Sequence, residues 1–119
     1  MTLQAPLIKG EKKQETCGEQ LRRMCKNIAD SITNPVDNSE HGEQASAASW
    51  MEGTYDIRYY VDRDKGYLGA EILVAGGGPT IWVNTYTQQV EGYWGGDKVL
   101  EYFRDELDLD GYCEEMYGC

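Results

Sequence analysis

Apolar and polar residues repeat along the chain with two different periods, which divide it into helical and extended segments. From about 15 to 33, apolar residues recur every three or four positions, as on one face of an amphipathic helix. Asn34-Pro35 ends this helix, because a residue before proline is disfavoured in helical conformation. A second helix is predicted over about 105–118, where the apolar positions are Leu109, Tyr112, Cys113, Met116 and Tyr117. A short helix is also expected near 45–52.

The middle of the chain alternates apolar and polar residues with the period of two that is typical of strands. Strands are expected over 55–61, 67–75, 80–85 and 89–94, separated by turns. Residues 98–103 fit either a fifth strand or the beginning of a helix. The predicted fold class is therefore α+β. An antiparallel meander of four or five strands is packed on one face by an N-terminal and a C-terminal amphipathic helix.

The predicted organisation is a flexible arm, 1–13, followed by a single domain, 14–119. Within that domain we expect the N-terminal helix over 14–34, the sheet over 54–96 and the C-terminal helix over 105–118. With 119 residues, of which 40% are hydrophobic, the chain suits one folded domain with one core. The beginning of the chain lacks the apolar stretch of a signal peptide, and Ile72-Leu73-Val74-Ala75 is far too short to span a membrane. These patterns predict a cytoplasmic protein that does not associate with membranes.

The net charge of the chain restricts the possible partners more than its length does. The chain holds 21 acidic and 11 basic side chains, a net charge of −10, and residues 91–119 alone hold nine acidic against two basic ones. Direct nucleic-acid binding is disfavoured, because that binding depends on neutralising phosphates with Lys and Arg. The balance instead favours a basic protein partner.

The acidic tail supplies most of the candidate partner-binding residues. Closely spaced carboxylates on a rigid element imitate the phosphates of a nucleic-acid backbone, and we expect these to carry binding while contributing little to stability. An EF-hand is disfavoured, because Met116 stands where the twelfth loop position needs Glu. A solvated acidic helix surface is the alternative. The candidates are Asp105, Glu106, Asp108, Asp110, Glu114 and Glu115, together with Glu91 in the fourth strand.

Three aromatic residues form a second candidate surface. Tyr60, Trp82 and Tyr93 alternate out of phase with the apolar set, so they are expected on the face of the sheet that the helices leave open. Such a platform anchors a protein partner or, in a less acidic chain, stacks bases. The alternative is cross-strand aromatic pairing that only stabilises the sheet.

No catalytic motif, metal ligand set or cofactor site is predicted. Gly76-Gly77-Gly78-Pro79 precedes a strand rather than a helix and lacks the Lys of a phosphate-binding loop, so a hairpin turn is expected. The single His41 lies in a polar loop without a nucleophile motif. The four cysteines form no C-x-x-C pair and are expected to be free thiols. An enzyme is therefore not expected.

Part of the chain resembles small acidic proteins encoded by phages and mobile elements. The resemblance is carried by the segment Gly77-Gly78-Pro79-x-Ile81-x-Val83-Asn84-Thr85, by Val90-Glu91-Gly92-Tyr93-Trp94-Gly95, and by the acidic helix from Cys113 to Tyr117. It covers roughly 45–117 and implies no catalytic residues. Short acidic proteins of such elements include anti-CRISPR and antirestriction inhibitors, which are related to this chain by context and charge rather than by a motif.

The resulting expectation is a non-enzymatic inhibitor of a host defence nuclease, of the anti-CRISPR or antirestriction type, in the cytoplasm of the host cell. It would bind a basic host protein, a nucleic-acid-guided or restriction nuclease, and block its nucleic-acid channel through an acidic surface. The alternative is a structural or adaptor protein that self-associates through the sheet.

Overall fold

The computed structural model describes residues 15–35 and 46–119. Five strands form one antiparallel sheet in the order β1-β2-β3-β4-β5, so each strand pairs with its neighbour in sequence. The strands are β1 (Asp56–Val61), β2 (Tyr67–Ala75), β3 (Thr80–Asn84), β4 (Gln89–Trp94) and β5 (Asp97–Tyr102). The predicted α+β class and antiparallel meander are confirmed. The segment that fitted either a strand or a helix is the fifth strand.

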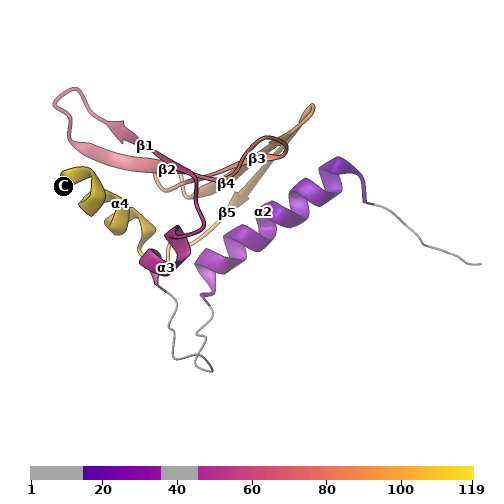
Figure 1. Ribbon diagram of the computed structural model, residues 1–119, viewed down its shortest axis with the longest axis horizontal. Helices are drawn as coiled ribbons and strands as arrows, with labels where there is room; N and C mark the ends of the chain where they lie inside the picture. The colour runs from indigo at the N-terminus through magenta and orange to yellow at the C-terminus, as the bar shows by residue number, and fades with distance from the viewer. Residues whose placement is uncertain (1–14, 36–45) are drawn as a thin grey trace, which may run out of the picture.

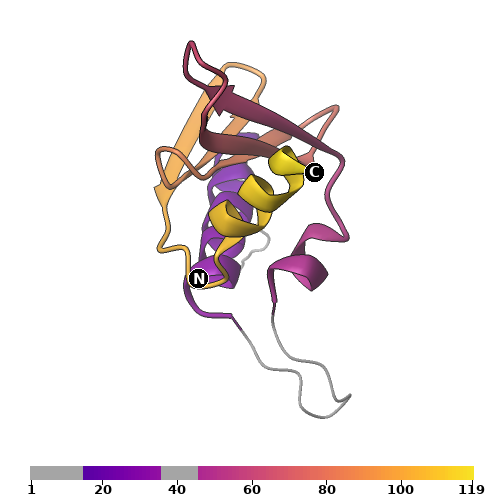
Figure 2. The same cartoon turned by 90° about the vertical axis from the view of Figure 1, so that its left-hand side faces the viewer.

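The helices lie together on one side of this sheet (Figure 1; Figure 2). They are α2 (Cys17–Thr33), α3 (Ala47–Met51) and α4 (Leu109–Gly118). The long helix α2 packs against β4 and β5, whereas α4 packs against β2. The other face of the sheet is left open by every helix of the described residues (Figure 1). The predicted arm, 1–13, and His41 lie outside the described residues.

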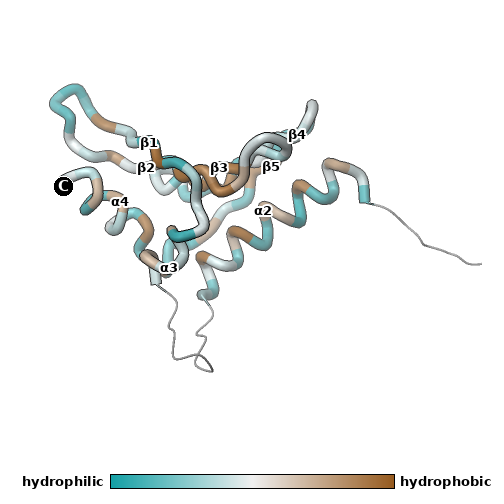
Figure 3. Tube along the Cα trace, viewed as in Figure 1, coloured by the Kyte–Doolittle hydropathy of each residue, from teal (hydrophilic) through white to brown (hydrophobic). Residues whose placement is uncertain are grey.

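The N-terminal helix forms where its capping and its apolar stripe coincide. Thr16 and Glu19 make a reciprocal capping box, in which each side chain accepts a hydrogen bond from the other residue's backbone N–H. One side of the helix buries Leu21, Cys25, Ala29 and Ile32. Hydrophobic positions accordingly recur as bands between hydrophilic ones along α2 (Figure 3). Burial of this stripe against the sheet supplies the hydrophobic free energy that holds α2 in place.

The strand register separates the two faces of the sheet. Ile57, Ile72, Val83 and Val90 stand opposite one another across four strands and face the helices. The last three of these are fully buried. Their neighbours in sequence consequently face away from the helices, because side chains alternate along a strand. The predicted hairpin turn at 76–79 connects β2 to β3, with Gly77 and Gly78 at φ 95° and 145°.

One glycine determines how closely α2 approaches the sheet. A Cβ at Gly92 in β4 would stand 2.5 Å from Cys25 Sγ and 2.9 Å from Leu21 Cδ1. The bare backbone of Gly92 therefore accommodates the buried stripe of α2. Neither neighbour is the free end of a flexible side chain, since both are fully buried.

We expect Gly92→Ala to lower the free energy of unfolding by about 1–3 kcal/mol, because the added methyl overpacks this contact. Gly96→Ala is the matched control, since a Cβ there has nothing within 4 Å. It should change stability by less than about 0.5 kcal/mol. Urea denaturation of the two variants measures both values. Equal stabilities would show that α2 does not rest on β4 in this way.

The C-terminal helix begins at Leu109, four residues later than the predicted bound. Asp105 is the reason, because its carboxylate accepts hydrogen bonds from the backbone N–H groups of Leu109 and Asp110, at 2.7 and 2.9 Å. Asp108 precedes the helix in a left-handed conformation, φ 58°, and accepts from Gly111 N–H. Residues 105–108 thus form a capping turn rather than a helical turn.

No helix of the described residues is both long and apolar enough to cross a membrane.

Candidate functional site

Asp110, one of the predicted partner-binding residues, forms hydrogen bonds within the protein. The Asp110 carboxylate accepts hydrogen bonds from Tyr67 Oη at 2.8 Å and from Thr85 Oγ1 at 2.7 Å. Thr85 Oγ1 in turn accepts from the backbone N–H of Ala70, at 2.9 Å. Tyr67 lies in β2 and Thr85 directly follows β3, so Asp110 connects α4 to two strands. Burial is the main cause that raises the pKa of the Tyr67 hydroxyl, which keeps it a proton donor to Asp110.

This geometry corrects the expectation that the acidic tail contributes little to stability. Asp105 caps the first turn of α4, and Asp110 satisfies two hydroxyl groups beneath the sheet. Reversing both to Lys would remove the acceptors and place cations beside backbone N–H groups. The carboxylates of Asp105 and Asp110 therefore stabilise the fold.

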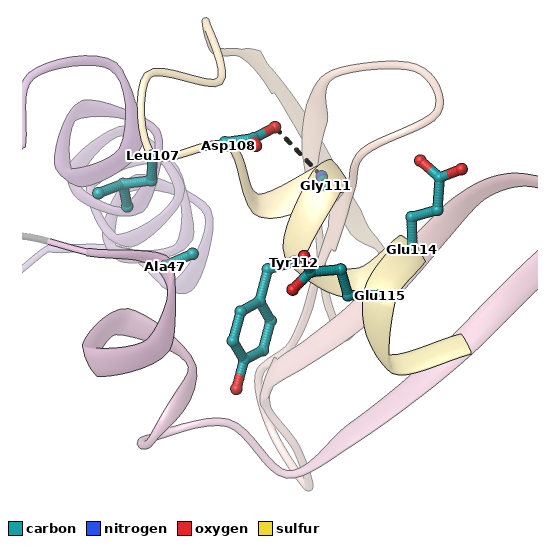
Figure 4. Close-up of a pocket in the computed structure, with 7 residues that line it drawn as sticks. All are labelled: Ala47, Leu107, Asp108, Gly111, Tyr112, Glu114 and Glu115. Atoms are coloured by element: carbon teal, nitrogen blue, oxygen red, sulfur yellow. Dashed lines mark hydrogen bonds between the residues drawn. The ribbon is translucent and has the colours of Figure 1, made fainter. Parts of the chain in front are cut away.

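The remaining tail carboxylates differ in their surroundings, and therefore in how easily a partner could contact them. Glu106 lies at the surface, 3.1 Å from Arg104 Nε in an exposed ion pair. Asp108, Glu114 and Glu115 line a cavity of about 560 Å³ between α3 and α4 (Figure 4). Of the six predicted tail residues, these three share one hollow, together with Tyr112.

The three predicted aromatic residues lie on the open face of the sheet. Trp82 stands opposite Leu73 and Glu91, whereas Tyr93 stands opposite Thr80 and Lys98. Tyr60 lies beside the Tyr86 ring, with centroids 5.6 Å apart. Glu91 shares this face with them, so four of the predicted partner-binding residues belong to one surface. We call it the open face.

A hydrogen-bonded network of polar side chains occupies the centre of the open face. Tyr60 Oη donates to Glu71 at 3.3 Å, and Asn84 Nδ2 donates both to Tyr60 Oη at 2.9 Å and to Glu91 at 3.3 Å. Asn84 is held rigidly, because its Oδ1 accepts from the backbone N–H groups of Tyr86 and Thr87 in the turn after β3. The network therefore couples two carboxylates, Glu71 and Glu91, through a fixed amide.

The fold disfavours the charged form of one of these carboxylates. Burial raises the pKa of Glu91, and the nearby Glu71 charge raises it further, whereas Asn84 and Lys98 act in the opposite direction. Ionised Glu91 thus opposes folding, although its side chain still lies at a face that no described helix covers. A carboxylate kept at such a position is a candidate functional group.

Both cations of the open face lie over aromatic rings. Arg58 Cζ is 4.7 Å from the centroid of the Trp82 ring, and Lys98 Nζ is 5.7 Å from that of Tyr93. Arg58 also lies 3.8 Å from Asp56 in an exposed pair. Neither cation donates a described hydrogen bond to Glu71 or Glu91. Lys98 is nevertheless near enough to favour the charged form of Glu91 through its own charge, against the effect of burial.

The predicted site residues did not include four residues of the open face: Glu71, Asn84, Leu100 and Tyr102. Leu100 stands opposite Glu91, and Tyr102 opposite Gln89. Both are exposed, at 45% and 76%. The alternation along β2 and β3 was a sufficient signal for the first two. Leu100 and Tyr102 required the knowledge that 97–102 is a strand.

The described residues offer little to nucleophilic or metal chemistry. Cys25 and Cys113 are buried, and burial raises the pKa of each thiol to about 11, so both stay protonated near neutral pH. Cys17 and Cys119 are free and exposed. Within 15–35 and 46–119, no three His, Cys, Asp or Glu side chains are grouped as metal ligands would be.

Comparisons with protein-family models, with curated proteins and with solved structures give no match to this chain.

We expect Asp110→Ala to lower the free energy of unfolding by about 1–3 kcal/mol, because the hydroxyl groups of Tyr67 and Thr85 lose their acceptor. Glu114→Ala is the control, since Glu114 is an exposed carboxylate on the same helix. It should stay within about 0.5 kcal/mol of the wild type. Thermal and urea unfolding measure both. A neutral Asp110→Ala would mean that α4 is held by apolar packing alone.

We expect Glu91→Gln to stabilise the protein slightly at pH 7, since it removes a carboxylate whose ionisation the fold disfavours. The sign follows from the raised pKa, because the folded state binds a proton more tightly than the unfolded state. Stability of the wild type therefore falls as pH rises from the ordinary glutamate pKa through the raised one. The advantage of Glu91→Gln should vanish below that range. Urea midpoints at pH 4 and pH 7 would contradict this if the wild type gained on the variant as pH rose.

Proposed function

We propose that this protein is a non-enzymatic inhibitor that binds a basic host protein, a nucleic-acid-guided or restriction nuclease, and obstructs its nucleic-acid channel. One observation carries the proposal: the open face joins two coupled, half-buried carboxylates, Glu71 and Glu91, to the rings of Trp82 and Tyr93. The site of action would be the cytoplasm of the host cell. The acidic surface of the proposal is thereby centred on the sheet rather than on the tail.

The chemistry of the open face resembles that of the ligand it would replace. A channel for nucleic acid presents Lys and Arg to phosphates and flat side chains to bases. Carboxylates beside aromatic rings offer the same two kinds of group in a rigid protein. The net charge of −10 favours a basic partner and disfavours nucleic acid itself as the ligand.

The energetics of Glu91 support the same conclusion. Desolvation of its carboxylate is unfavourable in the free protein. A Lys or Arg placed against Glu91 by a partner would offset this desolvation cost. It would thereby favour the ionised carboxylate and lower its pKa toward the ordinary value of a glutamate. Selection for stability alone favours an uncharged residue at this position, whereas selection for binding a cation favours Glu.

Self-association is the second candidate function, and one observation favours it. Leu100 and Tyr102 are exposed on β5, which is an edge strand of the sheet. An uncovered edge is a template for pairing with another chain. Sedimentation velocity over a range of concentrations separates the two functions. An inhibitor that acts as a monomer keeps one sedimentation coefficient, whereas self-association raises it with concentration.

The decisive experiment measures inhibition by matched charge reversals. A panel of purified bacterial RNA-guided and restriction nucleases is assayed for DNA cleavage with the wild type, Glu91→Lys and Asp30→Lys. Asp30 is the control, because it is exposed on α2, on the other side of the sheet. We expect Glu91→Lys to weaken inhibition by tenfold or more, about 1.4 kcal/mol, and Asp30→Lys to leave it nearly unchanged.

The proposal also requires that inhibition weaken as salt rises and that DNA compete with the protein for the nuclease. If the protein binds no nuclease of the panel, the proposal that its partner is a nuclease is contradicted. Equal loss in Glu91→Lys and Asp30→Lys would contradict the open face as the binding surface. The circular dichroism of both variants shows whether a loss arises from unfolding.

A further inference from the structure

A groove with two different halves runs between α3 and α4, on the helix side of the sheet. One half is the cavity of about 560 Å³ that contains Asp108, Glu114 and Glu115. The other is a cavity of about 200 Å³ that extends to the beginning of β1. Tyr112 lines both, so the halves adjoin along one side of α4. This groove and the open face lie on opposite sides of the sheet.

The two halves differ in chemistry. No basic side chain lines the larger cavity within the described residues, and three of its seven lining residues are carboxylates (Figure 4). The smaller cavity is formed mainly by apolar side chains, among them Met51, Ile57 and Met116. Met116 is 42% exposed, although it is a large apolar side chain at the end of a helix. An acidic half and an apolar half therefore share a boundary at one aromatic ring.

The groove runs along α4 from its N-cap, Asp108, to Met116, and the charge in the C-terminal half of the helix is uncompensated. Its last turn contains no basic residue, and Glu114 and Glu115 stand in the C-terminal half of the helix. The helix dipole places partial negative charge at that end, where carboxylates are unfavourable and cations are favourable. Neither carboxylate forms an ion pair with a described Lys or Arg. A cation in the larger cavity would lie near the carboxylates of Asp108, Glu114 and Glu115 together.

We infer that this groove binds a short peptide segment of a partner in which a basic residue, preferably Arg, is followed closely by an apolar residue. The guanidinium would lie among Asp108, Glu114 and Glu115, with its flat face available to the Tyr112 ring. The apolar side chain would enter the smaller cavity beside Met51 and Met116. At about 200 Å³ that cavity is below the usual size of a small-molecule site, about 300–1,000 Å³, and suits one side chain.

This site is independent of the open face and extends the proposed function. A partner that fills both surfaces must reach both sides of the sheet, so the groove serves a second protein or a second segment of a large one. Complementary charge identifies the occupant, because an acidic segment would meet three carboxylates and a purely apolar one would bury them without partners.

Methionine methyl groups make the test direct. When the methionine methyl groups are labelled with carbon-13, the NMR signals of Met51 and Met116 report on the smaller cavity. The signal of Met24 on α2 is an internal control. The probe is a hexapeptide of alternating Arg and Leu, compared with the Glu–Leu and Arg–Ser versions. We expect saturable shifts at Met51 and Met116 with the Arg–Leu peptide only, and none at Met24. Met51→Leu and Met116→Leu spectra assign the signals.

Glu115→Lys should weaken binding of the Arg–Leu peptide by about tenfold or more, whereas Asp30→Lys should leave it unchanged. Equal shifts with the Arg–Ser peptide, shifts at Met24, or unaltered binding by Glu115→Lys would overturn the inference, as would no shift at all. Shifts that grow with protein concentration alone would assign the groove to a second copy and overturn it too. Nuclease inhibition by Glu115→Lys is a separate measurement, so each proposal can fail without the other.

Discussion

The Asp110 carboxylate makes the contact on which the position of α4 depends. It accepts hydroxyl hydrogen bonds from Tyr67 in β2 and from Thr85 after β3, and thereby fixes α4 against β2. Since α4 forms one wall of the groove, the same carboxylate determines where Glu115 and Met116 stand. The meander itself is held by the buried residues of β2, β3 and β4, and α2 completes the core at Gly92. A half-buried polar contact therefore positions the groove, although Asp110 itself does not line it.

The period of two predicted the strands well, because each strand has one face buried against helices and one face open. Tyr60, Trp82 and Tyr93 could be assigned to the open face for the same reason. The coupling of Glu71 to Glu91 could not be predicted, since it depends on strand register and on the turn that orients Asn84. The tail was harder still. Asp105 and Asp110 look like surface charge in the sequence, and only the folded chain brings backbone N–H groups and hydroxyl groups to their carboxylates.

The open face and the groove between α3 and α4 have similar chemistry. In each, carboxylates stand beside aromatic or apolar side chains and form no ion pair with a Lys or Arg of the described residues. On the open face, Arg58 and Lys98 lie over rings rather than on Glu71 and Glu91. In the groove, three carboxylates face one hollow. Both arrangements carry negative charge that the fold tolerates and that a basic partner would relieve. Five of the 21 acidic residues of the chain belong to these two surfaces.

The most direct test of this account is hydrogen–deuterium exchange of the protein bound to a nuclease that it inhibits. Covering of the open face predicts slower exchange in β4 and β5, around Tyr93 and Leu100, and unchanged exchange in α2. A footprint confined to α2, with β4 and β5 exchanging as in the free protein, would contradict the open face as the inhibitory surface.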